Sequence, residues 1–182
     1  MHTRSVKGYT LIEVLVAVLV LAVGVIGAAG VQLAALRTRH GTALMSGGVQ
    51  LGGALAERMR ANSASMQGPD GANPYLQLHY DAATDGAPVV GAMCFAPASC
   101  SSADMAAFDL YEIKQALYDD YPSGRVAVCR DATVWSGGGL GWDCVVTANA
   151  PIVIKLGWRD RRADPRAPVA PSVALVVAGA FP

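Results

Sequence analysis

Apolar and polar positions divide the chain sharply, with a long uncharged stretch near its start. From Val14 to Val31 no side chain is polar, and the next charge is Arg37. Such a run is long enough to cross the roughly 30 Å hydrocarbon core of a bilayer as a helix. Glu13 is the one charge at the head of this stretch. The pattern therefore predicts a hydrophobic helix over residues 9–36 that holds the chain in a membrane.

The helical period continues beyond Arg37 with a single apolar stripe, and the charged residues Glu57, Arg58 and Arg60 lie off it. The stripe consists of Leu44, Gly48, Leu51, Leu55 and Met59. We expect residues 37–62 to continue the membrane helix in amphipathic form, with the stripe packed on a folded domain. The segment Asn62–Pro74, rich in Gly, Ser, Asn and Pro, ends the helix.

The remaining residues favour one more helix and then a sheet. Ser101 or Ser102 can cap a helix with Asp104 in its first turn, and Pro122–Gly124 stops it. The apolar stripe of this helix is Ala106, Leu110, Ile113, Leu117 and Tyr121. Short β-rich runs follow at Arg125–Arg130, Trp142–Thr147, Ile152–Trp158 and Ser172–Val177. We expect Ser136–Gly139 to join the first two of these strands as a hairpin loop.

This order of elements predicts an α+β fold, in which a long N-terminal helix packs on a small antiparallel sheet with a short extra helix. A chain of 182 residues leaves room for one modest domain beyond the anchor, at residues 63–182. Basic residues gather only at Arg159, Arg161, Arg162 and Arg166, which lie beside Asp160 and Asp164 and suggest a solvated loop. No nucleic-acid surface is predicted.

The cysteines indicate the compartment. All four follow the anchor, and they lack the Cys-x-x-Cys spacing of a zinc site or redox pair. In an exported domain, disulfides are the default. We favour a bond between Cys94 and Cys100, which enclose a tight loop, and one between Cys129 and Cys144, which lie on runs that resemble successive strands. The two other connectivities stay open.

Basic residues flank the anchor on both sides, so charge does not set its orientation.

The head of the chain carries a more specific pattern. A short basic leader ends at Lys7-Gly8 and is followed by Tyr9-Thr10-Leu11-Ile12-Glu13. This pattern resembles the class III signal of type IV prepilins, which usually have Phe where this chain has Tyr9. The resemblance implies a leader peptide of residues 1–8, cleavage by prepilin peptidase between Gly8 and Tyr9, N-methylation of Tyr9 and a pilin-like fold. Loss of the leader would leave a net charge of about −2.

Glu13 needs an explanation of its own, because a carboxylate on a membrane helix is costly unless it reaches the interface or a partner. After cleavage, the new amino group of Tyr9 would lie about one helical turn away. It can neutralise Glu13 in the same chain or in a neighbouring subunit. The alternative is an interfacial side chain with no role. We expect Glu13 to be an assembly contact.

Further patterns narrow the resemblance to minor pilins of the PilV type, the type IV pilus modification proteins. Glu57-Arg58-Met59-Arg60-Ala61-Asn62 is similar to a signature of that family at the end of its long helix. Other matching blocks are Cys94 through Cys100, Ala107–Leu110, Pro122–Gly124 and the late strand Ile152–Asp160. The resemblance implies other minor pilins and the major pilin as partners. It also implies a single-pass inner-membrane protein with a periplasmic C-terminal domain, which later joins the pilus fibre at the cell surface.

Enzymatic function finds little support. His2, His40 and His79 are far apart, and no hydrolase, metalloprotease or dinucleotide motif occurs. We expect no catalytic residues, no metal or cofactor and no small-molecule substrate. Asp119-Asp120 suggests solvated charge, and Trp135, Trp142 and Trp158 suggest sheet-face residues rather than a ligand platform. Two alternatives to a minor pilin stay open: a type II secretion pseudopilin, and a membrane-tethered periplasmic binding domain.

Overall fold

The computed structural model describes residues 8–91, 93–94, 99–147, 149–160, 164 and 167–177. The chain forms two compact units, Met1–Thr42 and Ala43–Pro182. The expected leader of residues 1–8 lies outside the described residues apart from Gly8. Arg161, Arg162 and Arg166 of the basic segment also lie outside them.

Helix α1 runs from Leu11 to Ala61, close to the helix from Tyr9 to about Asn62 that the sequence predicts. By length and composition it could cross a membrane. Its residues in the first unit are all exposed, and its buried residues belong to the second unit. Those buried residues are Gly48, Gly52, Leu55, Ala56 and Met59. The expected stripe is therefore the face that packs into the second unit.

Short elements follow α1 in the second unit. They are helix α2 at Ser63–Met66, the 3-10 helices η1 at Asp70–Ala72 and η2 at Pro74–Gln77, strand β1 at His79–Asp81 and helix α3 at Ala82–Asp85. Tyr75 and Leu76 of η2 and Tyr80 of β1 are buried in the core.

Helix α4, Ser102–Asp120, begins with a capping box between Ser101 and Asp104. The side chain of Ser101 accepts a hydrogen bond from the Asp104 N–H, and the Asp104 carboxylate accepts one from the Ser101 N–H. Ala106, Ile113 and Leu117 of the expected stripe are buried, and Tyr121 is the C-cap residue. Gly124 follows in a tight turn, where a Cβ would lie 2.5 Å from the Leu117 carbonyl oxygen.

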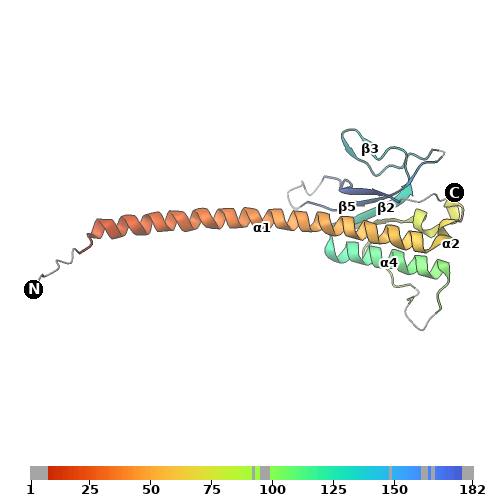
Figure 1. Ribbon diagram of the computed structural model, residues 1–182, viewed down its shortest axis with the longest axis horizontal. Coiled ribbons are helices and arrows are strands. Elements are labelled where there is room, and N and C mark those ends of the chain that lie inside the picture. The colour runs from red at the N-terminus through yellow and green to blue at the C-terminus, as the bar shows by residue number, and fades with distance from the viewer. Residues whose placement is uncertain are drawn as a thin grey trace, which may run out of the picture. The chain divides into compact units, whose positions relative to one another are not determined.

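One antiparallel sheet has the strand order β1-β2-β5-β6, with β2 at Arg125–Arg130, β5 at Ile152–Gly157 and β6 at Val173–Val176. Alternate residues such as Val126, Val128 and Ile154 point into the core that α1 and α4 share. Figure 1 shows α1, α4 and this sheet packed together in the second unit. These features confirm the predicted α+β, pilin-like fold class.

The prediction of a strand at Trp142–Thr147 is wrong. Strand β2 already has β1 and β5 on its two sides, so β2 has no edge left for this run to pair with as a hairpin partner. The hairpin that forms is smaller: β3 at Trp135–Ser136 pairs with β4 at Gly139–Leu140. Gly137 and Gly138, both with positive φ, make its two-residue turn. Ser136–Gly139 therefore joins β3 to β4, not β2 to a strand at Trp142–Thr147.

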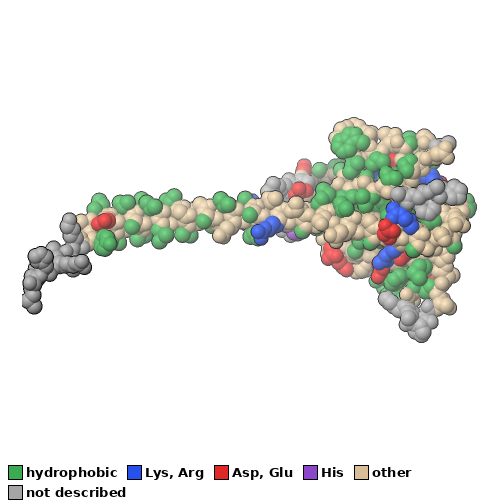
Figure 2. All heavy atoms as spheres, viewed as in Figure 1, with side chains coloured by type: hydrophobic (Ala, Val, Ile, Leu, Met, Phe, Trp, Pro, Cys, Tyr) green, Lys and Arg blue, Asp and Glu red, His purple; other side chains and the backbone are tan. Residues whose placement is uncertain are grey.

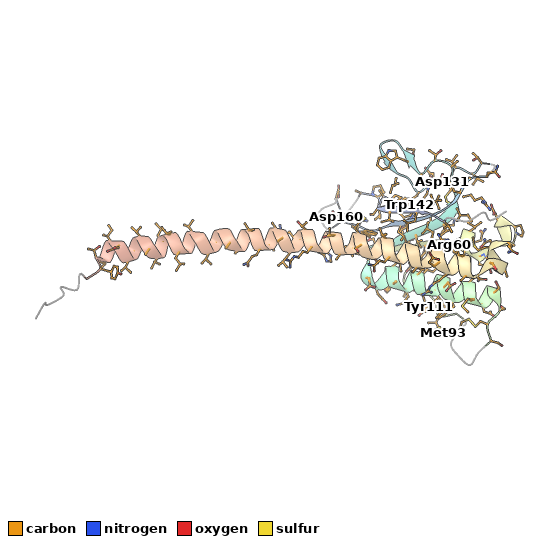
Figure 3. The ribbon with its side chains drawn as sticks, in the orientation of Figure 1. Arg60, Met93, Tyr111, Asp131, Trp142 and Asp160 are labelled. Carbon is orange, nitrogen blue, oxygen red and sulfur yellow. A yellow bond between two sulfur atoms is a disulfide. The ribbon has the colours of Figure 1, made fainter. Side chains whose placement is uncertain are left out.

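Residues 131–147, which we call the covering segment, instead lie over the second face of the sheet, where Ala127, Cys129 and Val153 are buried. Figure 3 shows Asp131 and Trp142 on the opposite side of the sheet from Tyr111 of α4. The Ala132 N–H donates to the Val145 carbonyl, and Lys155 Nζ donates to the Asp143 carbonyl at 2.5 Å. The Trp142 indole N–H donates to the Val169 carbonyl. Isolated hydrogen bonds from the backbone and from side chains thus hold this segment in place of a strand ladder.

Two disulfides join Cys94 to Cys100 and Cys129 to Cys144, the pairing that the sequence favours. Cys129 lies on β2, whereas Cys144 lies in the covering segment rather than on a strand. The second bond therefore ties that segment to the sheet. Part of the loop that the first bond closes, residues 95–98, lies outside the described residues.

Candidate functional site

The predicted processing point lies just before α1. Gly8, Tyr9 and Thr10 are not helical, and the Tyr9 side chain is 84% exposed. The Thr10 carbonyl accepts the N–H groups of Glu13 and Val14, so the first hydrogen-bonded turn of the helix begins there. The Gly8–Tyr9 peptide bond thus lies in exposed, non-helical backbone, which is the form of substrate that a peptidase can reach.

Glu13 lies in the first turn of α1 and is exposed. A carboxylate there faces the positive end of the helix dipole, which stabilises it modestly. Its side chain has no partner shown within the described residues, and the expected assembly contact would lie in another molecule or at the mature N-terminus.

The first unit of α1 displays a large apolar surface. Figure 2 shows hydrophobic side chains along this part of the helix. Each of the following is at least half exposed: Leu11, Ile12, Val14, Leu15, Val16, Val18, Leu19, Val20, Leu21, Val23, Val25, Ile26, Val31, Leu33 and Leu36. Gly24, Gly27 and Gly30 have open space around them, with nothing within 4 Å of an added Cβ. A surface of this kind is stable only against lipid or other apolar helices.

The other end of α1 carries the Glu57–Asn62 motif, whose side chains contact different parts of the second unit. Met59 is fully buried in the core. Arg58 pairs with Asp109 at 3.1 Å and with Glu112, both on α4. Arg60 pairs with Glu57 of its own helix at 2.5 Å. Asn62 donates to the Ser102 carbonyl at 2.8 Å and to the Tyr75 hydroxyl at 3.1 Å. The motif therefore fastens the end of α1 to α4 and η2.

Tyr75 and Asp109 complete this cluster, which we name the helix-end cluster: Arg58, Asn62, Tyr75, Asp109 and Glu112. The Tyr75 hydroxyl donates to Asp109 Oδ2 at 2.6 Å. Burial raises the pKa of Tyr75, and the hydrogen bond to Asp109 raises it further. For Arg58, burial works against the charge, but the carboxylates of Glu112 and Asp109 outweigh it and raise its pKa. Sequence reasoning singled out Arg58 and Asn62 but missed that Tyr75 and Glu112 join them.

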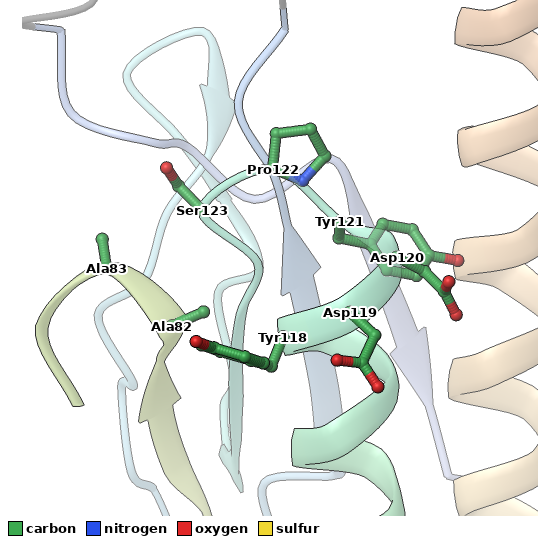
Figure 4. A pocket seen from close by; sticks show the side chains of 8 residues that line it. All are labelled: Ala82, Ala83, Tyr118, Asp119, Asp120, Tyr121, Pro122 and Ser123. Carbon is green, nitrogen blue, oxygen red and sulfur yellow. The ribbon is translucent and has the colours of Figure 1, made fainter. Parts of the chain in front are cut away.

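Among the residues weighed for chemistry, His2 lies outside the described residues, and the others are spread over both units. His40 lies in the first unit and His79 in the second, and both are exposed. Asp119 and Asp120 line an open hollow of about 620 Å³ with Tyr118, Tyr121, Pro122, Ser123, Ala82 and Ala83 (Figure 4). Within the described residues no group of His, Cys, Asp and Glu could hold a metal ion.

The tryptophans have separate environments. Trp158 packs against Tyr121 in the core, with ring centroids 5.1 Å apart. Trp142 lies under the guanidinium of Arg125, whose central carbon is 4.3 Å from the ring centroid. Trp135 is exposed on the small hairpin. In the basic segment, Arg159 donates to the carbonyl groups of Asp164 and Ala167.

Comparison with known families agrees with these observations. The family described as type IV pilin Tt1218 matches residues 30–111. The prokaryotic N-terminal methylation motif matches residues 3–29, which include Gly8, Tyr9 and Glu13. No match was found among curated proteins or among solved structures.

Proposed function

We propose that this chain, which matches the type IV pilin Tt1218 family over residues 30–111 and the N-terminal methylation motif over residues 3–29, is a minor pilin of the PilV type. Type IV pilins are structural subunits of pili, not enzymes. In our proposal, prepilin peptidase cuts the chain between Gly8 and Tyr9, and Tyr9 is then methylated. The subunit joins other minor pilins and the major pilin, and it primes or enters the pilus fibre.

One observation carries this proposal: the apolar surface of α1 begins within three residues of Gly8 and is exposed throughout the first unit. A cut at Gly8 would remove only the basic leader and leave this surface whole. The mature helix would rest in the inner membrane as a single pass, with residues 63–182 in the periplasm. In the filament, the same surface would pack against neighbouring helices instead of lipid.

Glu13 supports the same proposal. In a bundle of apolar helices a lone carboxylate is unfavourable, but one paired with the amino group of Tyr9 is neutralised. A neighbouring subunit supplies that amino group as readily as the same chain does. Glu13 then acts as an assembly contact that favours one axial position of the incoming subunit over others.

The Glu57–Asn62 motif supports assignment to the PilV type. Arg58 and Asn62 have polar partners on α4 and η2, Met59 is in the core, and Glu57 and Arg60 pair with each other. The motif is therefore built for the packing of this particular head domain. Membership of the PilV type, rather than of another minor pilin type, rests on this block and on the cysteine-bearing blocks that follow it.

Mass spectrometry of the mature N-terminus tests the proposal. We expect a chain that begins at N-methylated Tyr9 when the gene is expressed with a prepilin peptidase, and an intact leader when the peptidase is absent. We also expect the mature chain to co-purify with sheared pili. An intact Met1, or a cut beyond residue 25, would overturn the proposal. Correct cleavage with no trace in pili but with secretion-system filaments would favour a pseudopilin.

A further inference from the structure

Two fully buried charged side chains play no part in the function proposed above. Lys155 lies on β5 and Asp131 follows β2, and neither side chain has any exposed surface. Lys155 Nζ and Asp131 Oδ2 are 2.6 Å apart. Removing two charges from water costs more than a single ion pair readily recovers, so the arrangement needs a reason beyond attraction.

The surroundings of Asp131 place two backbone N–H groups on one of its carboxylate oxygens. Its Oδ1 atom accepts hydrogen bonds from two backbone N–H groups, those of Thr133 at 2.9 Å and Val145 at 3.0 Å. Two N–H groups directed at one carbonyl oxygen stabilise the oxyanion that forms when a nucleophile attacks the carbon. The Oδ2 atom faces the nitrogen of Lys155. After a proton passes from nitrogen to Oδ2, an amine and a carboxylic acid would face each other in a buried site.

The hydrogen-bond donors and acceptors around Lys155 and Asp131 would also suit an amide bond between the two side chains. A lysine ammonium has three N–H donors, whereas the one hydrogen bond found for Nζ among the described residues goes to the Asp143 carbonyl oxygen. Asp131 Oδ2 lies 2.6 Å from Nζ but has no hydrogen-bond partner there. A secondary amide has one N–H and one carbonyl oxygen. The N–H would donate to Asp143, and the oxygen would keep the N–H groups of Thr133 and Val145. Every donor and acceptor of the amide is then satisfied.

We propose that Lys155 and Asp131 condense to an intramolecular amide bond between Nζ and Cγ. The ammonium first passes a proton to Oδ2. The neutral amine then attacks Cγ, and the negative charge develops on Oδ1 between the two backbone N–H groups. A second proton moves from nitrogen to Oδ2, the Cγ–Oδ2 bond breaks, and one water molecule leaves. Ammonium and carboxylate become amide and water, so no oxidant, reductant or further reactant is required.

The same hydrogen bonds make the reaction slow. Burial alone would raise the pKa of Asp131, but Lys155 and the N–H groups of Thr133 and Val145 lower it overall. The reactive pair of amine and carboxylic acid is therefore a minor form of the folded protein. We expect the amide to form after folding and to accumulate with time, because the unfolded chain does not bring the two side chains together.

The amide would join β5 to the covering segment independently of the Cys129–Cys144 bond. That disulfide ties the same segment to β2. Reduction would break the disulfide but not the amide, so the covering segment would stay over the sheet in a reducing environment.

Amine labelling provides the test, because the full-length chain contains three lysines, Lys7 in the expected leader, Lys114 and Lys155. The full-length chain is purified from membranes in detergent, kept folded for a long incubation, then reduced, denatured, labelled at amines and mapped by mass spectrometry. We expect full labelling of Lys114, little labelling of Lys155, and a branched peptide in which Lys155 is joined to Asp131. The intact mass should be lower by one water.

The branched peptide is the decisive signal, because cyclisation at Asp85-Gly86 would also remove one water. Lys155→Arg keeps the cation but lacks a lysine amine, and it should have the full mass. Labelling of Lys155 as complete as that of Lys114, with no branched peptide, would overturn the proposal. The amide requires only the folded second unit, so its presence or absence is independent of cleavage at Gly8 and of pilus entry.

Discussion

Arg58 of α1 and Asp109 of α4 form an ion pair across 51 residues of sequence, with Nη1 3.1 Å from Oδ1. Their exposure differs: the side chain of Arg58 is 39% exposed and that of Asp109 only 6%. The buried carboxylate thus depends on a cation at the domain surface. The last turns of α1 are held by this polar contact as well as by the apolar stripe.

Loss of Arg58 should therefore destabilise the second unit. Arg58→Ala leaves the Asp109 carboxylate buried without its cation, and we expect a loss of about 1–3 kcal/mol in the free energy of unfolding. Glu57→Ala is the matched control, because Glu57 is exposed and its pair with Arg60 should contribute less than about 1 kcal/mol. Tryptophan fluorescence is a suitable probe, since all three tryptophans follow α1. Equal effects of the two substitutions would contradict the assigned role.

Alkaline pH should weaken the helix-end cluster through Tyr75. Because its pKa is raised in the folded state, the neutral hydroxyl contributes stability that is complete below the ordinary tyrosine pKa near 10. That stability is lost as pH rises above about 10, since the unfolded chain ionises more readily. Unfolding midpoints measured from neutral to alkaline pH should fall in the wild type and fall less in Tyr75→Phe. Identical pH profiles would show that Tyr75 is not the group responsible.

Replacing two glycines of α1 by alanine should change the stability of the protein in opposite directions. An added Cβ at Gly48 would lie 2.6 Å from the ring of Trp158, whereas at Gly53 nothing lies within 4 Å. Gly53→Ala should stabilise the helix by about 0.5–1 kcal/mol through helix propensity alone. Gly48→Ala should destabilise the second unit, because a rigid ring in the core must shift. Thermal unfolding of both variants by tryptophan fluorescence tests the difference in sign.

The two disulfides should contribute unequally. The Cys129–Cys144 bond spans 15 residues and should stabilise by about 3 kcal/mol on the chain-entropy account, while the Cys94–Cys100 bond spans 6 and should give less. Cys129 is also buried on β2. We expect removal of both Cys129 and Cys144 to lower the denaturation midpoint more than removal of both Cys94 and Cys100. A larger loss from the shorter loop would reverse this ranking.

Replacement of Glu13 separates processing from assembly. If Glu13 neutralises the Tyr9 amino group in the filament, Glu13→Ala leaves an ammonium without a counter-charge, and the subunit should remain in the inner membrane. Cleavage should continue, because Gly8 is intact, whereas Gly8→Glu should block cleavage itself. Immunoblots of membranes and sheared pili provide the measurement. Normal entry of Glu13→Ala into pili would show that the charge is incidental.

Local signals predicted much of this fold. Strand β2 occupies the predicted Arg125–Arg130, and the Ser101 cap and the α4 stripe agree with the pattern in the sequence. Each of these elements has a signal inside its own residues, such as a capping box, a period or a stop. Strand β1, with three residues, is too short to show alternation, and it exists because β2 offers it an edge.

The errors and omissions arose from long-range contacts. Trp142–Thr147 has the composition of a strand, but the available edges of β2 were taken by β1 and β5, which local composition does not reveal. Tyr75 and Asp109 are separated by 34 residues and meet only after η2 and α4 pack. The head of the chain matches the N-terminal methylation motif, a linear signal that needs no long-range contact, whereas the roles of Gly8, Tyr9 and Glu13 stay predictions.

The exposed apolar surface of α1 limits the route that a subunit can take. Burial of apolar surface stabilises by about 25 cal/mol per Å². Passage through water would therefore be strongly unfavourable in free energy for a helix that is exposed along its whole first unit. If the chain enters a filament as proposed, the helix should pass directly from lipid to the filament. We expect no free aqueous intermediate, and the concentration that governs incorporation is that of subunits in the plane of the membrane.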